Sequence, residues 1–459
     1  MDIQLSAQQQ AVVDCNEPRI VVKACPGSGK TFSVAARMAR LLRENNLSRH
    51  QGIAAISFTN TACDVIKKEL KETFGYPNVS YPSFIGTIDS FINTYIFLPY
   101  AHLVMGCDCR PEIVGTEFNK WFDYNSSQRG YGGKIIDPNY FVDKVSFNQD
   151  NEPIPLVSAE EFTFSWSNIK KKNGEYRKEV TDIIEAKHIH FVKGKANQAD
   201  ATYFAFRILK KYPSIAQDLV CRFPILIIDE AQDTTELQMA IIDKLSLCGA
   251  ESIMLIGDPD QAIFEWNTAN PHLFMEKYNS PNWHSLDLSE NRRSSEKICQ
   301  LANRFSGNEM CSIASDKDYT DEPCIKGYFD TPESVNQITN HFIEKCNEMG
   351  LDESEYAVVF RGQKFGETNF GLVNNDSSSR QNSPWINGHY GVRDIVYGKY
   401  LIDHGKYTDG LSLIEKGCYK ITKRVRYVPA STIRREIAEI GFRRHRAEMF
   451  DFIQKLPST

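Results

Sequence analysis

Short apolar runs alternate with amphipathic segments along the first 90 residues of the chain. Residues 19–24 (RIVVKA) and 52–58 (GIAAISF) have the length and apolar character of buried strands, and a segment with helical spacing follows each of them. In the helical segment at 30–44, four apolar residues fall on one face: Val34, Met38, Leu41 and Leu42. Two more buried-strand runs come later, at 223–233 (FPILIIDEAQD) and 252–261 (SIMLIGDPDQ). Strands that alternate with helices in this way predict a parallel, doubly wound sheet.

The alternation stops between about 92 and 196, in a stretch rich in aromatic residues, and we expect an inserted domain there. A second α/β pattern begins after about 288, with predicted strands at 324–329 (CIKGYF) and 355–361 (EYAVVFR) on either side of a predicted helix at 333–350. Beyond a polar loop (NNDSSSRQNSP) the chain has a helical and basic pattern. The pattern predicts a first core in two parts (1–91 and 197–287), an inserted domain (92–196), a second α/β segment (288–373) and a helical, basic segment (374–459).

Composition indicates a soluble globular protein of three or four domains, since 459 residues with 41% hydrophobic and 24% charged residues fit that class. The polar start and the short apolar stretches argue against a signal peptide and a membrane span. Twelve cysteines without a CxxC pair favour reduced thiols in the cytoplasm. A net charge of −6 does not by itself indicate a nucleic-acid-binding protein. Local basic segments at 168–178, 420–427 and 433–448 leave two interpretations open, solvated surfaces or contacts to a polyanion.

A phosphate-binding loop is predicted directly after the first strand, where the chain reads ACPGSGKT and begins with alanine instead of the usual glycine. Gly27 and Gly29 would let backbone N–H groups turn toward the phosphates of a nucleotide. Lys30 would reach the β- and γ-phosphates, and the hydroxyl of Thr31 would hold Mg²⁺. The loop residues expected to bind the nucleotide are Ala24, Cys25, Pro26, Gly27, Ser28, Gly29, Lys30 and Thr31.

Two adjacent carboxylates follow the predicted strand that ends before DEAQD. Asp229 would complete the Mg²⁺ site together with Thr31, and Glu230 would orient and deprotonate the attacking water. The alternative is an acidic helix cap, but two carboxylates directly after a buried strand are costly to place without a cation. The sequence therefore predicts ATP and Mg²⁺ as the ligands of this site.

The motifs around this site resemble the ordered signature of superfamily 1A helicases of the UvrD, Rep and PcrA type. Segments that carry the resemblance follow the family order from residue 5 to about 361: LSAQQQAVV, ACPGSGKT, SFTNTAC, GTIDSF, NQADATYFAFRILKKYP, DEAQD, IGDPDQAIFEW and ENRRSSEKI. The resemblance implies an α/β fold with two RecA-like parallel-sheet cores and mostly helical inserted domains. It also implies an ATP-driven translocase or helicase that moves 3′ to 5′ on single-stranded or partly duplex DNA.

The resemblance implies roles for individual residues around the nucleotide. Gln9 would read the edge of adenine, and Gln261 would sense the γ-phosphate and couple it to DNA. Arg293 would stabilise charge on the transferring phosphoryl group. Together with these, the expected catalytic set is Lys30, Asp229, Glu230, Gln261 and Arg293.

The same resemblance implies contacts to single-stranded DNA, with aromatic side chains stacked on bases. The residues expected to make them are Phe58, Thr59, Asn60, Thr87 and Trp266. Core packing is the alternative for the two aromatic residues, because large rings are readily buried.

Two features depart from the family pattern. The family commonly has arginine after the P-loop threonine, where this chain has Phe32. It commonly has tyrosine before the arginine that corresponds to Arg293, where this chain has Arg292. One ring and one planar cation remain, so we expect an adenine sandwich with its sides exchanged. Asn267 also replaces an arginine that approaches DNA in the family.

Two late family motifs, one of which supplies a further arginine to the γ-phosphate, do not appear in this sequence. The resemblance therefore implies that 288–373 is the N-terminal part of an incomplete second core and 374–459 part of a helical inserted domain. Either a longer natural protein or a partner that completes the site would explain this. The alternative function is an ATP-sensing, DNA-binding subunit beside a nuclease, since the chain resembles helicase subunits of bacterial anti-phage systems such as Gabija. A nuclease activity of its own finds little support, because the alternating His188 and His190 are more typical of one strand face than of metal ligands.

Overall fold

The computed structural model describes these residues: 5–44, 46–76, 79, 81–115, 130–131, 134–135, 138–157, 162, 166, 169–171, 174–262, 270–306, 309–314, 332–352, 354–359, 365, 391–403, 407–424, 433, 437 and 441–457. The chain divides into two compact units, Met1–Pro323 and Cys324–Thr459. The first unit contains the predicted nucleotide site.

A parallel six-stranded sheet forms the centre of the first unit, with the strand order β12-β1-β11-β10-β2-β3. Its strands are β1 (Arg19–Ala24), β2 (Ile53–Ser57), β3 (Phe84–Thr87), β10 (Ile225–Ile228), β11 (Ser252–Gly257) and β12 (His284–Leu288). The predicted parallel sheet is therefore confirmed. Because β11 lies between β1 and β10, the loops that follow these three strands meet at one edge of the sheet, where α/β proteins place their ligands.

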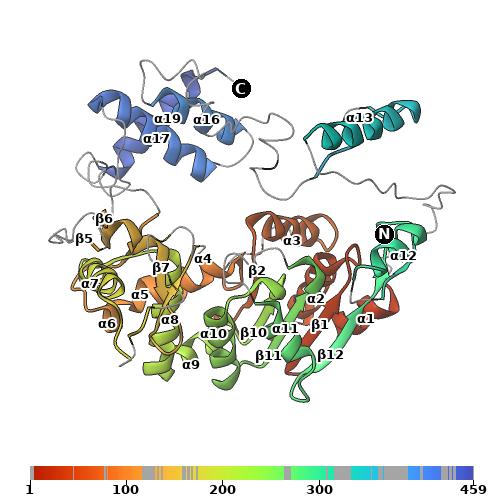
Figure 1. Cartoon of the computed structure of the whole chain (residues 1–459), viewed down its shortest axis with the longest axis horizontal. Coiled ribbons are helices and arrows are strands. Elements are labelled where there is room, and N and C mark those ends of the chain that lie inside the picture. Colours follow the sequence, from red (N-terminus) through yellow and green to blue (C-terminus); the bar gives the residue numbers. More distant parts are fainter. Residues whose placement is uncertain are drawn as a thin grey trace. The chain divides into compact units, whose positions relative to one another are not determined.

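Side chains of β1, β2, β3, β10 and β11 alternate between two apolar cores, so helices cover both faces of the sheet (Figure 1). Ile20 and Val22 of β1 face one core, and Val21 faces the other. The apolar core that contains Ile20 and Val22 is covered by α1 (Ala7–Asp14), α2 (Lys30–Glu44) and α3 (Asn60–Glu72). The apolar core that contains Val21 is covered by α4 (Ile88–Ile92), α8 (Gln198–Lys211), α9 (Pro213–Arg222), α10 (Glu236–Leu247) and α11 (Pro271–Tyr278).

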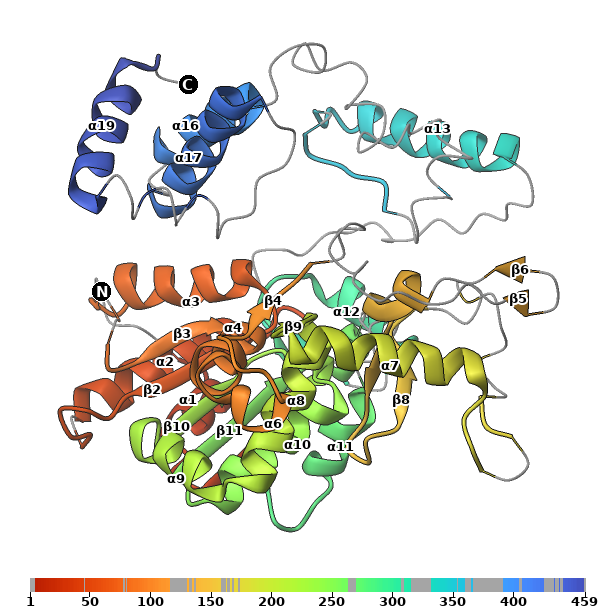
Figure 2. The same cartoon turned by 90° about the vertical axis from the view of Figure 1, so that its left-hand side faces the viewer.

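Short elements and one long helix lie between α4 and α8. The helical elements are η1 (Asn93–Phe97), α5 (Leu98–Tyr100), α6 (His102–Met105), η3 (Pro138–Lys144) and α7 (Lys178–Val192). The strands are β4 (Glu112–Ile113), β5 (Gly130–Tyr131), β6 (Lys134–Ile135), β7 (Val145–Phe147), β8 (Pro153–Pro155) and β9 (Lys195–Ala196). Figure 2 shows α7 beside α8, where the rings of Phe191 and Phe204 meet with centroids 4.8 Å apart.

The strand interpretation of the alternating histidines is wrong, because His188 and His190 lie on helix α7. His190 is fully buried and His188 is exposed. Two residues spaced by two do not distinguish a period of 2.0 from one of 3.6, and the buried Val180, Ile183 and Ala186 follow the helical period. Among the described residues, no group of three or more His, Cys, Asp and Glu side chains is arranged to hold a metal ion.

The second α/β pattern begins with β13 (Glu290–Asn291), which pairs in parallel with β14 (Cys311–Ser312), and with α12 (Glu296–Asn303) between them. The second unit contains α13 (Pro332–Glu348), α16 (Val392–Asp403), α17 (Tyr407–Lys423) and α19 (Phe442–Lys455). The predicted helix at 333–350 is confirmed as α13. Residues 355–359 form no strand, contrary to prediction, and the strand predicted at 324–329 lies outside the described residues. No described helix has the length and apolar content needed to cross a bilayer.

Candidate nucleotide site and nucleic-acid groove

The P-loop connects β1 to the first turn of α2, in the position that phosphate binding requires. Gly27 and Gly29 have φ values of 71° and 80°, a left-handed conformation that only glycine adopts without strain. Ser28 stabilises the turn, since its hydroxyl donates to the carbonyl of Cys25 at 2.8 Å. Lys30, the first residue of α2, is buried. The loop therefore presents backbone N–H groups and one cation at a helix N-terminus.

The P-loop meets the predicted carboxylates across the sheet. Lys30 Nζ donates to Glu230 Oε2 at 2.9 Å, and Thr31 Oγ1 lies 3.4 Å from Asp229 Oδ2. Burial, followed by the neighbouring Glu230 charge, raises the pKa of Asp229 to about 6. A hydroxyl beside a buried carboxylate is an oxygen pair that suits Mg²⁺, and a bound cation would remove the cost of burying that charge.

Hydrogen bonds continue from Glu230 to the loop after β11. Gln232 Nε2 donates to Glu230 Oε2 at 3.0 Å, while its Oε1 accepts from the backbone N–H of Asp258 at 3.0 Å. Asp258 in turn accepts from Gln261 Nε2 at 2.7 Å. Gln232 and Asp258 are buried. A single path of contacts therefore joins Lys30, Glu230, Gln232, Asp258 and Gln261.

The loop after β11 also contacts the segment that follows α12. Ser306 donates a hydrogen bond from its hydroxyl to a carboxylate oxygen of Asp260.

Burial raises the pKa of Asp258 to about 6, although Lys30 acts in the opposite direction. The carboxylate of Asp258 is thus another charge whose cost a bound cation or a proton would reduce.

Arg292 and Arg293 lie against the P-loop, although nearly the whole first unit separates them from it in sequence. The backbone N–H of Arg292 donates to the carbonyl of Gly27 at 3.0 Å. A Cβ atom added at Gly27 would lie 2.9 Å from the Cβ of Arg293. Both arginines are exposed, at the edge of the nucleotide site.

Gln9 and Phe32 lie next to the loop at Gly29, where an added Cβ atom would be 2.8 Å from Gln9 Nε2 and 3.9 Å from Phe32 Cβ. Gln9 is buried in α1, and its Nε2 donates to the carbonyl of Ser28 at 3.1 Å. Its Oε1 accepts from the backbone N–H of Ser6 at 3.2 Å. Phe32 is half-buried with its ring 5.6 Å from that of Phe74. The side chain predicted to read adenine is thus part of the support of the P-loop.

The three residues at the start of the loop are buried or partly buried and serve its framework. Ala24 ends β1, and the carbonyl of Pro26 accepts a hydrogen bond from a side-chain amide. Cys25 packs with Cys299 and Met310 in a small apolar cluster. Burial raises the pKa of the Cys25 thiol to about 12, so this cysteine is an apolar packing residue and not a reactive thiolate.

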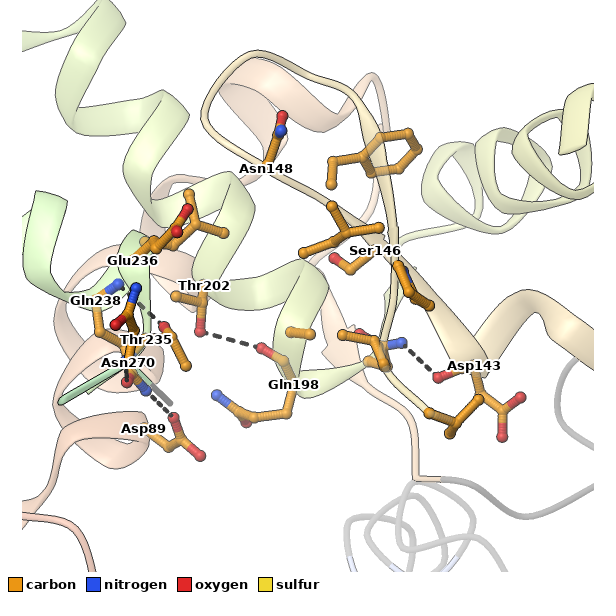
Figure 3. Close-up of a pocket in the computed structure, with 18 of the residues that line it drawn as sticks. Asp89, Asp143, Ser146, Asn148, Gln198, Thr202, Thr235, Glu236, Gln238 and Asn270 are labelled. Atoms are coloured by element: carbon orange, nitrogen blue, oxygen red, sulfur yellow. Dashed lines mark hydrogen bonds between the residues drawn. The ribbon is translucent and has the colours of Figure 1, made fainter. Parts of the chain in front are cut away.

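A groove of about 710 Å³ opens between the sheet domain and the inserted elements (Figure 3). Its apolar lining consists of Phe58, Phe147, Ile154, Pro155, Leu156, Val157, Ala199 and Leu237. Its polar lining consists of Asp89, Asp143, Ser146, Asn148, Asn197, Gln198, Thr202, Thr235, Glu236, Gln238 and Asn270. Helices α8, α10 and α11 begin here, with the N-caps Asn197, Thr235 and Asn270. Helix N-termini favour negative charge, whereas the carboxylates of the lining oppose it.

The predicted DNA contacts reach this groove to different extents. Phe58 lines it, and Thr87 caps α4 two residues before Asp89, which also lines it. Thr59 caps α3, and Asn60 is the first residue of that helix; both are exposed outside the groove lining. Burial raises the pKa of Asp89, which accepts a hydrogen bond from Gln238 at 3.3 Å. Trp266 and Asn267 lie outside the described residues.

Residues 5–282 match the family model of the UvrD/REP helicase N-terminal domain. The chain belongs to the UvrD/Rep helicase family. Among UvrD/Rep-like relatives, a probable DNA helicase II homolog of Mycoplasma capricolum is 26% identical over 67% of this chain. The ATP-dependent DNA helicase PcrA of Bacillus subtilis is 24% identical over 66%, and the Gabija protein GajB of Bacillus cereus is 25% identical over 65%. The matches cover 41%, 39% and 48% of the lengths of these three relatives.

Four residues of this UvrD/Rep-type site were not predicted from the sequence: Gln8, Gln232, Asp258 and Asn291. Gln232 and Asp258 stand within the DEAQD and GDPDQ motifs, so their position beside predicted site residues was an available signal. Gln8 and Asn291 also stand beside predicted residues, next to Gln9 and Arg292, but nothing local indicates their contacts, which join segments that are 281 and 265 residues apart.

Proposed function

We propose that this chain couples ATP hydrolysis to 3′-to-5′ movement along single-stranded DNA, as part of a DNA translocase or helicase. The observation that carries the proposal is the path of hydrogen bonds from Lys30 through Glu230, Gln232 and Asp258 to Gln261. This path begins at the loop that would hold the phosphates. It ends at Gln261, which precedes the segment AIFEW, whose Trp266 the family resemblance assigns to DNA.

The residues of the site suit phosphoryl transfer from ATP to water. The P-loop backbone and Lys30 would hold the phosphates, and Thr31 and Asp229 would hold Mg²⁺. Bound Mg²⁺ supplies positive charge to the phosphate oxygens. Glu230 accepts a proton from the attacking water while the bond to the leaving ADP oxygen breaks. Arg293 compensates the negative charge on the transferring group.

The groove lined by Phe58 is the proposed path of the DNA strand. A ring in the lining stacks on bases without sequence preference, as a translocase requires. Helix N-termini at the groove suit phosphate groups. The coupling of the γ-phosphate to DNA through Gln261 follows from the family resemblance. The 3′-to-5′ direction rests on the family resemblance alone.

A second candidate is an ATP-sensing, DNA-binding component of a nuclease-containing defence complex. The match to the Gabija protein GajB favours it, and a segment of 139 residues is also 30% identical to an ATP-dependent helicase/nuclease protein of Natranaerobius thermophilus. In this role the same nucleotide site would report ATP to a partner, and hydrolysis would be slow.

Steady-state ATP hydrolysis with and without single-stranded DNA tests the proposal, with Glu230→Gln as the control. Hydrolysis that DNA stimulates and the substitution abolishes supports the motor. Binding of both ATP and DNA without turnover contradicts the motor and supports the sensor. Failure to bind ATP contradicts both.

A further inference from the structure

The segment that carries Arg292 and Arg293 is held against the P-loop by the side-chain amide of Asn291. Asn291 is only 3% exposed. Its Nδ2 donates to the carbonyl of Pro26 at 2.8 Å. Its Oδ1 accepts from the backbone N–H groups of Arg293 and Ser294, each at 2.8 Å. One side chain therefore binds the P-loop with its donor and the arginine segment with its acceptor.

A second amide holds the same segment from α1. Gln8 Oε1 accepts from the backbone N–H groups of Ser289 and Glu290 at 2.8 and 3.3 Å. Its Nε2 donates to Ser289 Oγ at 2.9 Å. Gln8 and Asn291 together bind the backbone on both sides of β13, immediately before the arginine pair.

The contact between the segment and the P-loop is close enough to exclude a side chain at Gly27. A Cβ atom there would lie 2.9 Å from both Asn291 Oδ1 and Arg293 Cβ. The backbone N–H of Arg292 also donates to the carbonyl of Gly27 at 3.0 Å. Glycine at this position thus serves the docking of the arginine segment in addition to the left-handed turn of the loop.

We propose that Asn291 is a positioning residue, which keeps the backbone of Arg293 docked on the P-loop so that the arginine forms part of the nucleotide site. The role rests on the proposed ATPase function of that site. The carbonyl of Pro26 needs a hydrogen-bond donor, and the backbone N–H groups of Arg293 and Ser294 need an acceptor. At position 291 one side-chain group must supply both. An amide provides both, whereas a carboxylate provides only acceptors and an apolar side chain neither.

The test compares Asn291→Asp, which loses the donor to Pro26, with Asn291→Ala, which loses both functions and adds no charge. Asn282→Asp, in an exposed turn, is the matched control. A milder variant on the other side of the segment, Gln8→Glu, keeps an acceptor for Ser289 and Glu290; Gln10→Ala on the exposed face of α1 is its control.

We expect kcat for ATP to fall roughly 10- to 100-fold in both Asn291 variants with little change in KM, since small displacements of a transition-state group cost this much. In an Arg293→Ala background the Asn291 substitutions add no further loss. Hydrogen exchange at the amide of Arg292 becomes faster, while exchange in β1 and β11 stays the same. Gln8→Glu shows a smaller change of the same kind.

Two results overturn the positioning role. One is hydrogen exchange at the Arg292 amide that is unchanged in the Asn291 variants. The other is a kcat for the double variants that is lower than that of Arg293→Ala alone. The exchange measurement needs no turnover. A wild-type chain that does not hydrolyse ATP therefore contradicts the proposed motor, while the exchange result still decides whether Asn291 docks the segment. If Asn291→Ala loses protection across β1 and β11, exchange at Arg292 in Asn291→Asp decides: faster exchange there alone supports the positioning role, and unchanged exchange overturns it.

Discussion

Lys30 of the P-loop and Glu230 after β10 bind each other, with Nζ and Oε2 2.9 Å apart. The proposed reaction uses Lys30 for the phosphates and Glu230 for the attacking water. Both groups must therefore exchange this mutual contact for a contact to the substrate. The pair is only partly exposed, so the exchange occurs in a site with little solvent screening.

Lys30→Ala and Glu230→Gln are expected to separate binding from hydrolysis. Glu230→Gln removes the general base and lowers kcat by roughly 10²- to 10⁴-fold, while ATP affinity is kept because Glu230 acts on the attacking water and not on the nucleotide. Lys30→Ala lowers both affinity and kcat. Nucleotide binding by fluorescence titration, measured beside turnover, checks the difference, and equal affinity losses in the two variants would contradict the assignment.

Arg292→Ala is expected to raise KM for ATP and to leave kcat nearly unchanged. The backbone of Arg292 docks on Gly27, and the planar guanidinium is suited to stack on adenine opposite Phe32. Arg304→Ala, on an exposed position after α12, is the control. A KM equal to that of the wild type would rule out the exchanged adenine sandwich.

Phe58→Ala is expected to weaken binding of single-stranded DNA by about 1–3 kcal/mol, the contribution of one stacked base. Phe58→Trp keeps a ring in the groove and is expected to bind nearly as well as the wild type. Fluorescence anisotropy with a labelled oligonucleotide, together with thermal unfolding, distinguishes base stacking by Phe58 from packing of its ring in the core. Lower stability with unchanged DNA affinity would indicate that Phe58 only packs against the core.

Lys187→Met is expected to destabilise the first unit by about 3–5 kcal/mol, because it leaves a buried carboxylate without its cation. Lys187 Nζ donates to Asp200 Oδ2 and to the carbonyl of Val142, each at 2.8 Å, and both members of the ion pair are fully buried. The pair joins α7 and η3 to α8. Urea unfolding measures the loss; Lys170→Met, in an exposed pair with Glu152, is the control and should change little.

Asp258→Asn is expected to gain stability relative to the wild type as pH rises from about 4 to 7. Burial raises the pKa of Asp258 in the folded chain to about 6, above its value of about 3.9 in an unfolded chain. The folded state therefore retains a proton that the unfolded state has lost, so the contribution of Asp258 is full below about pH 3.9 and disappears as pH rises through about 6. Urea unfolding without nucleotide or Mg²⁺ tests this, and a pH-independent difference would contradict it.

Local pattern was sufficient for the elements that build the sheet. The predicted strand at 19–24 and helix at 30–44 coincide with β1 and α2, because an apolar run, a glycine loop and an amphipathic repeat are all local signals. The same reasoning failed for His188 and His190, where two residues were too few to define a period. Pattern also predicted a strand where residues 355–359 form none.

For the functional site, too, local sequence specified some features and the tertiary structure specified others. The sequence by itself determined the family, the parallel sheet and the residue types that could bind and hydrolyse ATP, since Lys30, Asp229 and Glu230 lie in short motifs with local spacing. Only the tertiary structure decided that Gln232 links Glu230 to Asp258 and that Asn291 joins Pro26 to Arg293. Such bonds depend on which strands lie side by side, and no local pattern specifies a hydrogen bond between residues that only folding brings together.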